Sequence, residues 1–230
     1  MIKIECDYVF GWESAIRGMR NPMNSWDKSD TGWVPEDGQE TFLEIDFDSL
    51  CVKVIGPNDL NLMKKLVKAG SDHSKFMRMI NVTCDITAPL YWWKEYDTYK
   101  VGTVANSCST MHKITSKPIV LSDFSIDDFP LNDEVDGITF ADIFVDIVMD
   151  CETLRQKYIE TGDKRFWRAL IQVLPTSYNQ KRTVQLNYAV LRNMYHSRKS
   201  HKLDEWRDFC KWVESLPYSE LITGEGSGNE

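Results

Sequence analysis

Four signature motifs of common enzyme classes are missing from this chain. It contains no G-x-G-x-x-G, no G-x-x-x-x-G-K-[ST], no G-x-S-x-G and no H-E-x-x-H. These motifs mark dinucleotide-binding sites, nucleoside triphosphatases, serine hydrolases and zinc proteases, respectively. The sequence therefore gives no support to any of these four functions.

Long apolar runs are also missing. The amino end, MIKIECDYVF, lacks the basic start and apolar core of a signal peptide, and no segment approaches the ~20 apolar residues of a membrane span. The composition, 42% hydrophobic and 27% charged, is that of an ordinary globular protein. We therefore expect a cytoplasmic protein that binds no membrane.

Paired spacings of metal ligands or disulfide cysteines are absent as well. The six cysteines lie far apart without a C-x-x-C pair, and the four histidines are scattered. Asp142, Asp146 and Asp150 share one helical spacing, which makes either a row of metal ligands or a solvated acidic face. No His or Glu joins this row at ligand spacing, which favours the acidic face. We predict reduced cysteines and no metal site.

Positive charge is scarce and unevenly distributed. The chain has 27 Lys and Arg against 35 Asp and Glu, a formal net charge of -8, which argues against a broad grip on a nucleic acid backbone. Residues 121–153 hold ten acids and no Lys or Arg, whereas residues 174–203 hold six Lys and Arg and no acid. The cationic stretch either pairs with the acidic one or faces an anionic ligand.

Apolar spacing predicts strands mainly in the first half of the chain and helices in the second. The expected strands are residues 2–10, a hairpin of 41–47 with 50–55, and a central strand at 76–87. The expected helices are 12–20, 60–69, 90–97, 138–161, 164–174, 179–199 and 203–216. This order favours an α+β fold, with a mostly antiparallel sheet and a helical layer, in a single domain over residues 1–222 followed by a flexible tail, 223–230.

Three segments together resemble a known family. They are GSDHSKF from Gly70, APLYWWKEYDTYKVGTVANSCSTMHKI from Ala88, and VLPTSYNQKRTVQLNYAVLRNMYHSR from Val173. The last segment is similar, without gaps, to the stretch between VLP and a functional arginine in the flavin-dependent thymidylate synthases. The resemblance covers about half of the chain and implies the fold of that family.

The resemblance also implies roles for individual residues. Arg198 falls on the catalytic arginine that lies against the pyrimidine. Lys181, in place of an arginine, and Ser109 fall on residues that hold the nucleotide phosphate, and Asn106 falls near them. Asn187, Asn193, His73 and Lys100 fall on or beside positions that bind the flavin.

The family's Arg-His-Arg signature is replaced here. The facing residues are Tyr99-Lys100-Val101, or Thr98-Tyr99-Lys100 with a shift of one, so at most Lys100 remains of two flavin-binding cations. Met111 stands where the family has another phosphate arginine. Each lost charged contact weakens anion binding by roughly 2 kcal/mol.

Two functions are therefore open. The resemblance implies a homotetrameric enzyme that transfers a one-carbon unit from methylene-tetrahydrofolate to a pyrimidine deoxynucleotide such as dUMP, with FAD, reduced by NADPH, as hydride donor. The alternative is a nucleotide-binding or structural oligomeric protein that has lost flavin chemistry. Tyr91, Trp92 and Trp93 suit either function, as a ring platform or as buried packing.

Overall fold

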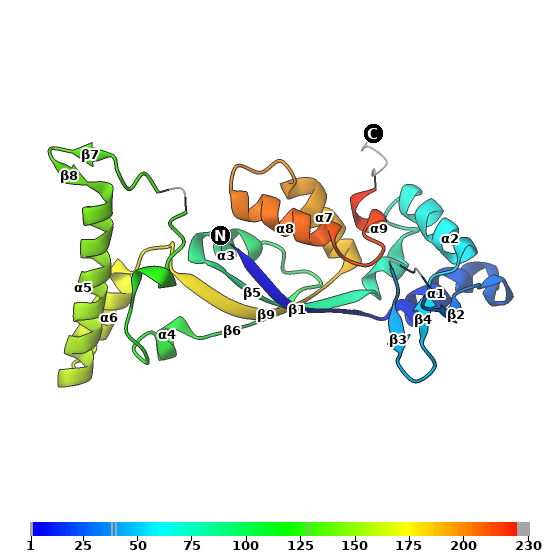
Figure 1. Ribbon diagram of the computed structural model, residues 1–230, viewed down its shortest axis with the longest axis horizontal. Helices are drawn as coiled ribbons and strands as arrows, with labels where there is room; N and C mark the ends of the chain where they lie inside the picture. Colours follow the sequence, from blue (N-terminus) through cyan, green and yellow to red (C-terminus); the bar gives the residue numbers. More distant parts are fainter. Residues whose placement is uncertain (1, 38, 40, 128, 225–230) are drawn as a thin grey trace. The chain divides into compact units, whose positions relative to one another are not determined.

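Helices and strands alternate along most of the chain in the computed structural model, which describes residues 2–37, 39, 41–127 and 129–224. The strands are β1 (Lys3–Phe10), β2 (Gly32–Pro35), β3 (Glu44–Asp46), β4 (Cys51–Val54), β5 (Asn81–Pro89), β6 (Val104–Ser107), β7 (Glu134–Val135), β8 (Ile138–Thr139) and β9 (Asn179–Asn187) (Figure 1). The helices are α1 (Trp12–Arg20), α2 (Pro57–Lys68), α3 (Leu90–Tyr96), α4 (Thr110–Lys113), α5 (Phe140–Thr161), α6 (Lys164–Val173), α7 (Tyr188–Arg198), α8 (Asp204–Glu214) and α9 (Glu220–Thr223).

The strands form three sheets. The largest has the order β1-β5-β9-β6, and the others have the orders β2-β4-β3 and β7-β8. Both smaller sheets are antiparallel throughout. Together with the helices this makes an α+β fold with mostly antiparallel sheet, as predicted.

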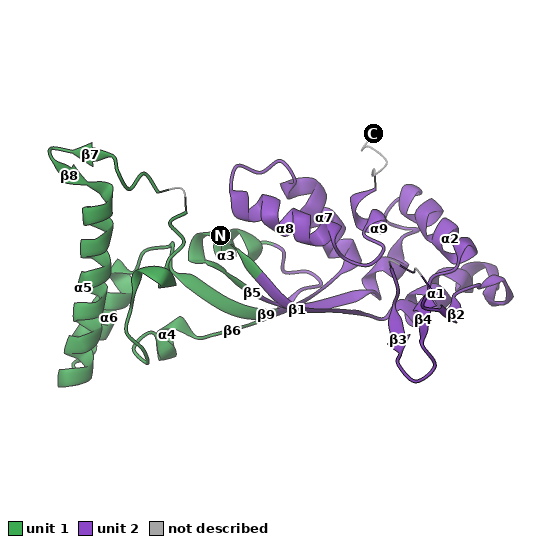
Figure 2. Cartoon of the chain, in the orientation of Figure 1, with its two compact units in different colours: residues 1–3, 86–98, 106–183 green, residues 4–85, 99–105, 184–230 purple. Residues whose placement is uncertain are grey.

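The chain divides into two compact units (Figure 2). Unit 1 comprises residues 1–3, 86–98 and 106–183, and unit 2 comprises residues 4–85, 99–105 and 184–230. Strands β5 and β9 contribute residues to both units. The predicted single domain over residues 1–222 stays a prediction, and residues 225–230 of the predicted tail lie outside the described part of the chain.

Unit 1 has its own apolar core between α5, α6 and the segment before them. The buried members are Ile114, Ile119, Phe124, Phe144, Val148, Cys151 and Leu170. Helix α5 begins at a capping box, in which Thr139 and Asp142 satisfy each other's backbone N–H groups, and it ends at Gly162. Of the apolar positions on the expected helix over residues 138–161, Phe144 and Val148 are buried in this core, whereas Ile143 and Ile147 are 40% and 37% exposed.

Unit 2 is centred on aromatic rings. The Trp12 ring lies edge-on to Tyr188 and to Tyr218, with centroids 5.2 and 5.5 Å apart. Gly11 joins β1 to α1 in a left-handed conformation, with φ 93°, and a Cβ there would overlap the carbonyl oxygen of Met79. Only glycine fits this junction without strain.

Two sequence predictions of secondary structure were wrong in part. Residues 179–187 form strand β9 instead of the first half of a helix, and only α7 from Tyr188 onward is helical. The segment alternates exposed Thr183 and Gln185 with buried Val184 and Leu186, a two-residue period that a strand satisfies. The central strand begins at Asn81 because Lys75–Arg78 forms a 3₁₀ turn that buries Phe76.

The other expected elements are present, with shifts of a few residues at their ends. The hairpin is confirmed as the antiparallel β3–β4 pair, and Trp92 and Trp93 of α3 are fully buried, which assigns both rings to packing. Among the described residues, no helix has both the length and the apolar character of a membrane span.

Candidate functional site

A cavity of about 510 Å³ in unit 1 carries three lysines. Lys113 lies at the end of α4, Lys117 lies in the loop that follows, and Lys181 lies near the start of β9. Ser109, Asp123 and Tyr178 also line this cavity, which we call the lysine pocket. Three amines around one carboxylate give the walls an excess of positive charge, which suits an anionic group.

Hydrogen bonds fix Ser109 beside Lys181. The backbone N–H of Cys108 donates to the Lys181 carbonyl oxygen over 2.9 Å. The Gln180 side-chain amide donates to the Cys108 carbonyl and to the Thr110 hydroxyl, over 2.9 and 3.0 Å. The segment 108–110 is thereby held against β9, and two residues far apart in the sequence meet on one wall.

The strand conformation separates Lys181 from Arg182. Successive side chains of a strand point to opposite faces, and Arg182 accordingly packs 4.2 Å from the Trp93 ring and pairs with Asp97 at 2.7 Å. A helix would have placed the two side chains about 100° apart. The expected helix over residues 179–199 is therefore wrong for Lys181 and Arg182.

The charges of the lysine pocket are partly satisfied within the protein. Lys117 pairs with Asp123, and this hydrogen bond raises the pKa of Lys117. Burial raises the pKa of Tyr178, and nearby Asp123 raises it further. Lys117 therefore keeps its positive charge at neutral pH.

In several cases, charged residues of the cationic stretch (174–203) and of the acidic stretch (121–153) form ion pairs with residues outside the other stretch. Arg182 pairs with Asp97, Glu152 with Arg155 and Asp123 with Lys117. Asn106 lies on β6 in the same unit as the lysine pocket, but it is exposed and does not line the cavity.

Arg198 lies in unit 2 against two aromatic rings. Its Nε donates to the Tyr99 hydroxyl over 2.9 Å, and its guanidinium lies 4.8 Å from the Trp206 ring and 5.5 Å from the Tyr99 ring. Lys100 follows Tyr99 directly and is exposed. Tyr99, which faces the family signature in either alignment, thus holds the predicted catalytic arginine in place.

Asn187 caps the start of α7. Its Oδ1 accepts from the Val190 N–H over 3.1 Å, and the side chain is largely buried. Gly102, with φ 78°, packs so closely here that an added Cβ would lie 3.0 Å from Asn187 Nδ2. The loop that carries Lys100 therefore rests on the beginning of α7.

A second cavity, of about 430 Å³, lies within unit 2. Arg78, Arg192, Asn193 and His196 line it together with Ser71 and Ser74, and we call it the arginine pocket. His73 belongs to the same 70–74 segment, but it is exposed and does not line the cavity. Of the predicted flavin residues, Asn193 is thus the one that faces this cavity.

Two buried atoms in the arginine pocket lack partners. Among the described residues, neither Arg192 Nη2 nor His196 Nε2 finds a hydrogen-bond partner. Arg192 Nη1 donates to three carbonyl oxygens in the carboxyl-terminal segment, those of Leu221, Ile222 and Gly224. Burial lowers the pKa of His196, and neighbouring Arg192 lowers it further. Buried polar atoms without partners are rare and indicate a missing ligand or water.

The described residues contain no cluster of three or more His, Cys, Asp or Glu side chains that could hold a metal ion. Asp142, Asp146 and Asp150 are exposed on α5.

Known structures share this architecture. A flavin-dependent thymidylate synthase, ThyX, of Helicobacter pylori, complexed with FAD and dUMP, superposes with a TM-score of 0.65 at 19% identity, over 96% of this chain and 98% of that one. The chain has the flavin-dependent thymidylate synthase fold. A second structure of the Helicobacter pylori enzyme with FAD and dUMP gives 0.65 at 18% identity, over 97% and 98% of the two chains.

A UMP/dUMP methylase, PolB, of Streptomyces cacaoi, bound with 5-Br dUMP, also shares the flavin-dependent thymidylate synthase fold. Its TM-score is 0.58 at 14% identity, over 98% of this chain and 96% of that one. No protein-family model and no curated protein matches the sequence.

Sequence reasoning missed several residues of the two cavities. Lys113 and Lys117 lie in and after a one-turn helix whose position no spacing rule predicts. Arg192 and His196 are one helical turn apart on α7, and their spacing in the sequence already placed them on one side of a helix. The sequence did not show that they are shielded from solvent, which is what distinguishes them from surface residues.

Proposed function

We propose that this chain is a flavin-dependent thymidylate synthase-like enzyme that methylates a pyrimidine nucleoside monophosphate such as dUMP. The observation that carries the proposal is the meeting of Ser109 and Lys181 in the lysine pocket. The family resemblance assigns the nucleotide phosphate to these two residues, and the shared fold supports that assignment.

The lysine pocket suits a phosphate monoester. Lysine ammonium groups bind phosphate as point charges, and Lys113 and Lys117 offer replacement charge for the arginine that the family has at Met111. The Ser109 hydroxyl accepts from the His112 N–H over 3.3 Å and keeps its own hydrogen to donate to a phosphate oxygen.

The arginine pocket suits part of FAD. Asn193, Arg192 and His196 would hold it, because these three hydrogen-bonding side chains line one cavity. When bound, the reduced flavin supplies the hydride, NADPH reduces it, and methylene-tetrahydrofolate supplies the carbon unit. In this proposal His73, Lys100 and Asn187 add contacts to the cofactor.

Arg198 is the proposed catalytic residue. Its guanidinium is held by the Tyr99 hydroxyl and by two ring faces, which limit its freedom. A fixed positive charge stabilises the negative charge that develops on a pyrimidine ring during its alkylation.

The test is release of tritium from [5-³H]dUMP with FAD, NADPH and methylene-tetrahydrofolate. We expect release by the wild type and at least about tenfold less by Arg198→Ala. Lys181→Gln should raise the dissociation constant of dUMP about tenfold, whereas Lys164→Gln, an exposed lysine of the same unit outside the pocket, should leave it unchanged. Absence of both release and dUMP binding would refute the proposal.

The second candidate function is nucleotide binding without flavin chemistry. The feature that favours it is Met111, which stands where the family has a phosphate arginine and is 48% exposed. A colourless purified protein that binds dUMP and fails to bind added FAD would favour this function. A yellow protein with flavin absorbance would exclude it.

A homotetramer is part of the proposal for either function. The exposed apolar residues of α5 support assembly.

A further inference from the structure

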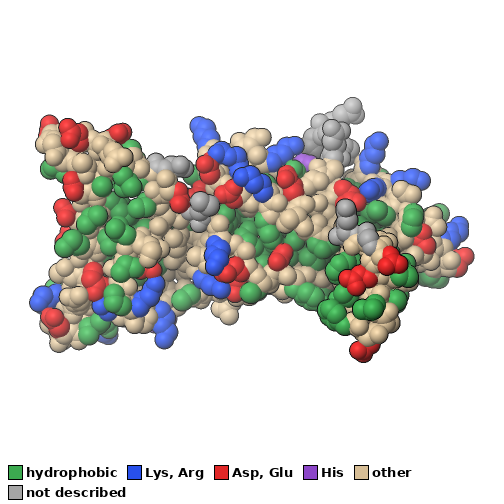
Figure 3. Space-filling model, viewed as in Figure 1, with side chains coloured by type: hydrophobic (Ala, Val, Ile, Leu, Met, Phe, Trp, Pro, Cys, Tyr) green, Lys and Arg blue, Asp and Glu red, His purple; other side chains and the backbone are tan. Residues whose placement is uncertain are grey.

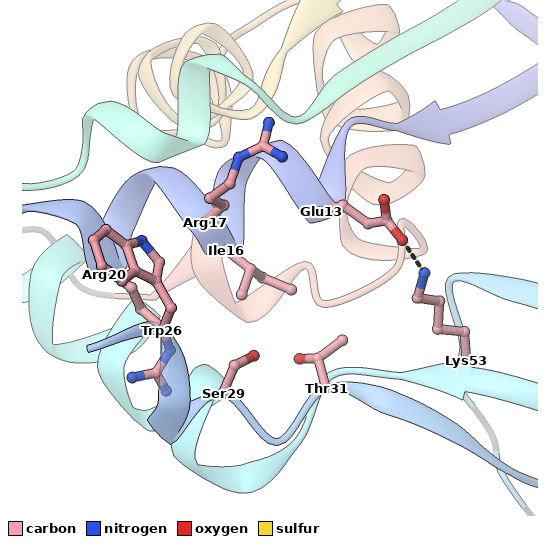
Figure 4. A pocket seen from close by; sticks show the side chains of 8 residues that line it. All are labelled: Glu13, Ile16, Arg17, Arg20, Trp26, Ser29, Thr31 and Lys53. Carbon is pink, nitrogen blue, oxygen red and sulfur yellow. Dashed lines mark hydrogen bonds and ion pairs between the residues drawn. The ribbon is translucent and has the colours of Figure 1, made fainter. Parts of the chain in front are cut away.

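A third cavity, of about 320 Å³, lies in unit 2 apart from both pockets described so far (Figure 4). It is lined by Glu13, Ile16, Arg17, Arg20, Trp26, Ser29, Thr31 and Lys53, none of which lines the arginine pocket. We call it the Trp26 pocket. Its volume is at the lower end for small-molecule sites and suits one or two fused rings.

A buried ion pair makes one wall of the Trp26 pocket rigid. Arg20, 4% exposed, donates from Nε to Asp59 Oδ1 over 2.6 Å, and its Nη atoms donate to the carbonyls of Ser25 and Lys28. Asp59 Oδ2 accepts from the N–H groups of Asp30 and Thr31. These bonds hold the whole 25–31 segment against α1 and α2, so the wall exists before any ligand arrives.

The Asp59 carboxylate also decides whether the hydroxyls of Ser29 and Thr31, which form the floor of the pocket, act as donors or acceptors toward a ligand. Burial alone would raise the pKa of Asp59, but the hydrogen bonds from Ser29, Thr31 and Arg20 outweigh it and hold this pKa below its usual range. Asp59 is therefore ionised and can only accept. Ser29 and Thr31 each donate their single hydroxyl hydrogen to its Oδ2 over 2.7 Å. Figure 4 shows the two hydroxyl oxygens turned toward each other, opposite Ile16.

Each of these hydroxyls consequently offers only lone pairs to a ligand. A hydroxyl has one donor hydrogen, and both hydrogens are spent on Asp59. A molecule that lies on this floor must present N–H or O–H groups to it, because acceptor atoms there would meet oxygen lone pairs.

The remaining walls select a flat ring. Trp26 is 51% exposed, yet its Nε1 donates to Asn21 over 2.8 Å, which holds the indole in place at one end of the pocket. The Ile16 side chain points toward the two hydroxyls (Figure 4). A fixed and half-exposed indole beside an aliphatic side chain is a stacking surface for an aromatic ring.

The charges disfavour a cationic ligand. Arg20 is neutralised by Asp59, and Lys53 is paired with Glu13 at the opposite end from Trp26. Arg17, which is exposed, adds one further positive charge at the rim. The donor groups that the floor requires are therefore those of an uncharged amino group and not those of an ammonium group.

We infer that the Trp26 pocket binds a neutral, planar, amino-substituted heteroaromatic ring, with its amino N–H groups on Ser29 and Thr31 and its face on Trp26. This inference does not depend on the proposed enzymatic function, since it uses none of the residues that carry that function.

The test compares two probes of nearly equal shape. 9-Methyladenine has amino N–H donors, and 6-methoxy-9-methylpurine has an acceptor in their place. We expect 9-methyladenine to shift the Trp26 indole resonance in ¹H–¹⁵N spectra and to bind at least about fivefold more tightly than the methoxy compound. The indole resonance is assigned from its loss in Trp26→Phe.

Variants locate the binding. Trp26→Ala should weaken 9-methyladenine about tenfold, the usual effect of losing one stacked ring, and Trp26→Phe should retain most of the affinity. The control is Phe47→Ala, because Phe47 is 76% exposed and does not line the pocket. Ser29→Ala should weaken 9-methyladenine more than it weakens the methoxy compound.

Equal binding of the two probes would overturn the inference. So would an unchanged affinity in a folded Trp26→Ala variant, or the absence of any shift of the Trp26 indole up to the solubility limit of 9-methyladenine.

Discussion

Glu152 shows how a single side chain ties a helix to a loop. Its carboxylate accepts from Arg155 Nε and Nη2 over 2.7 and 2.6 Å and from the Ile119 N–H over 2.8 Å. Arg155 in turn donates to the Thr115 carbonyl over 3.2 Å. This network links α5 to the segment that begins beside the lysine pocket, so its loss should loosen that segment.

The network makes stability depend on pH in an acidic window. The hydrogen bond from Arg155 is the main cause that lowers the pKa of Glu152 from 4.5 to about 2. A lowered pKa in the folded state means that the stabilisation is complete above the unfolded value and disappears as the pH falls through the folded value. We predict that Glu152→Gln is less stable than wild type at neutral pH and that the difference shrinks between pH 4.5 and about 2.

Urea unfolding of both proteins across this pH range measures the difference. Glu160→Gln is the control, because Glu160 is exposed and pairs with exposed Lys157, so its effect should be small and should not vary with pH. A Glu152→Gln difference that stays constant down to pH 2 would show that the carboxylate charge is not involved.

At the scale of elements, the helices of the chain were largely predictable and strand β9 was not. Helical spacing gave α5 and α6 within two residues, because each buries one continuous stripe on the other. In β9 the two-residue alternation covers only Thr183 to Leu186 and runs directly into the helical spacing of α7. Pairing with β5 and β6 decides the strand, and that information lies elsewhere in the chain.

The candidate site could also be predicted only in part from the sequence. The resemblance pointed to Ser109 and Lys181, which do line one cavity, and to Asn193, which lines another. It gave no reason to expect Lys117, because the loop that carries it owes its position to the hydrogen bonds and packing of unit 1.

The strand conformation of β9 predicts that two adjacent cations contribute unequally to the free energy of unfolding. Arg182 packs on Trp93 and pairs with Asp97, so we expect Arg182→Ala to lower the free energy of unfolding by about 1–2 kcal/mol. Lys181 points to the other face and is exposed, so Lys181→Ala should change stability by less than about 0.5 kcal/mol. Denaturant titration measures both, and equal losses would contradict the strand geometry.

The turn between β1 and α1 gives a second prediction at this scale. Gly11→Ala forces a Cβ against the Met79 carbonyl in addition to the strain of a positive φ. Gly137 also has a positive φ, but open space surrounds it, so Gly137→Ala isolates the strain, about 1–2 kcal/mol. Thermal unfolding should show a clearly larger loss for Gly11→Ala. Equal losses would mean that β1 and η3 (Lys75–Arg78) separate easily.

At the scale of the whole molecule, unit 1 exposes apolar side chains that would stay in contact with water in a monomer. Ile143, Val145, Ile147 and Met149 lie on α5 outside the core of the unit, with Met149 61% exposed. Figure 3 shows hydrophobic side chains at the surface over this helix. By helical spacing, Val145 and Met149 lie on another side of α5 than Ile143 and Ile147. The side with Ile143 and Ile147 forms an exposed apolar face, and such faces mark interaction sites.

A second copy of the chain is the partner that we predict for this face, in a homotetramer. Light scattering of the wild type at micromolar concentration should therefore give four times the 26.7 kDa of one chain. Ile147→Asp buries a charge in such an interface, which costs several kcal/mol, and should shift the mass toward smaller species. Met23→Asp is the control, because Met23 is an exposed methionine of unit 2 and its replacement should leave the mass unchanged. A wild-type monomer would refute the assembly, whereas a tetramer that tolerates Ile147→Asp would place the interface on another face than α5.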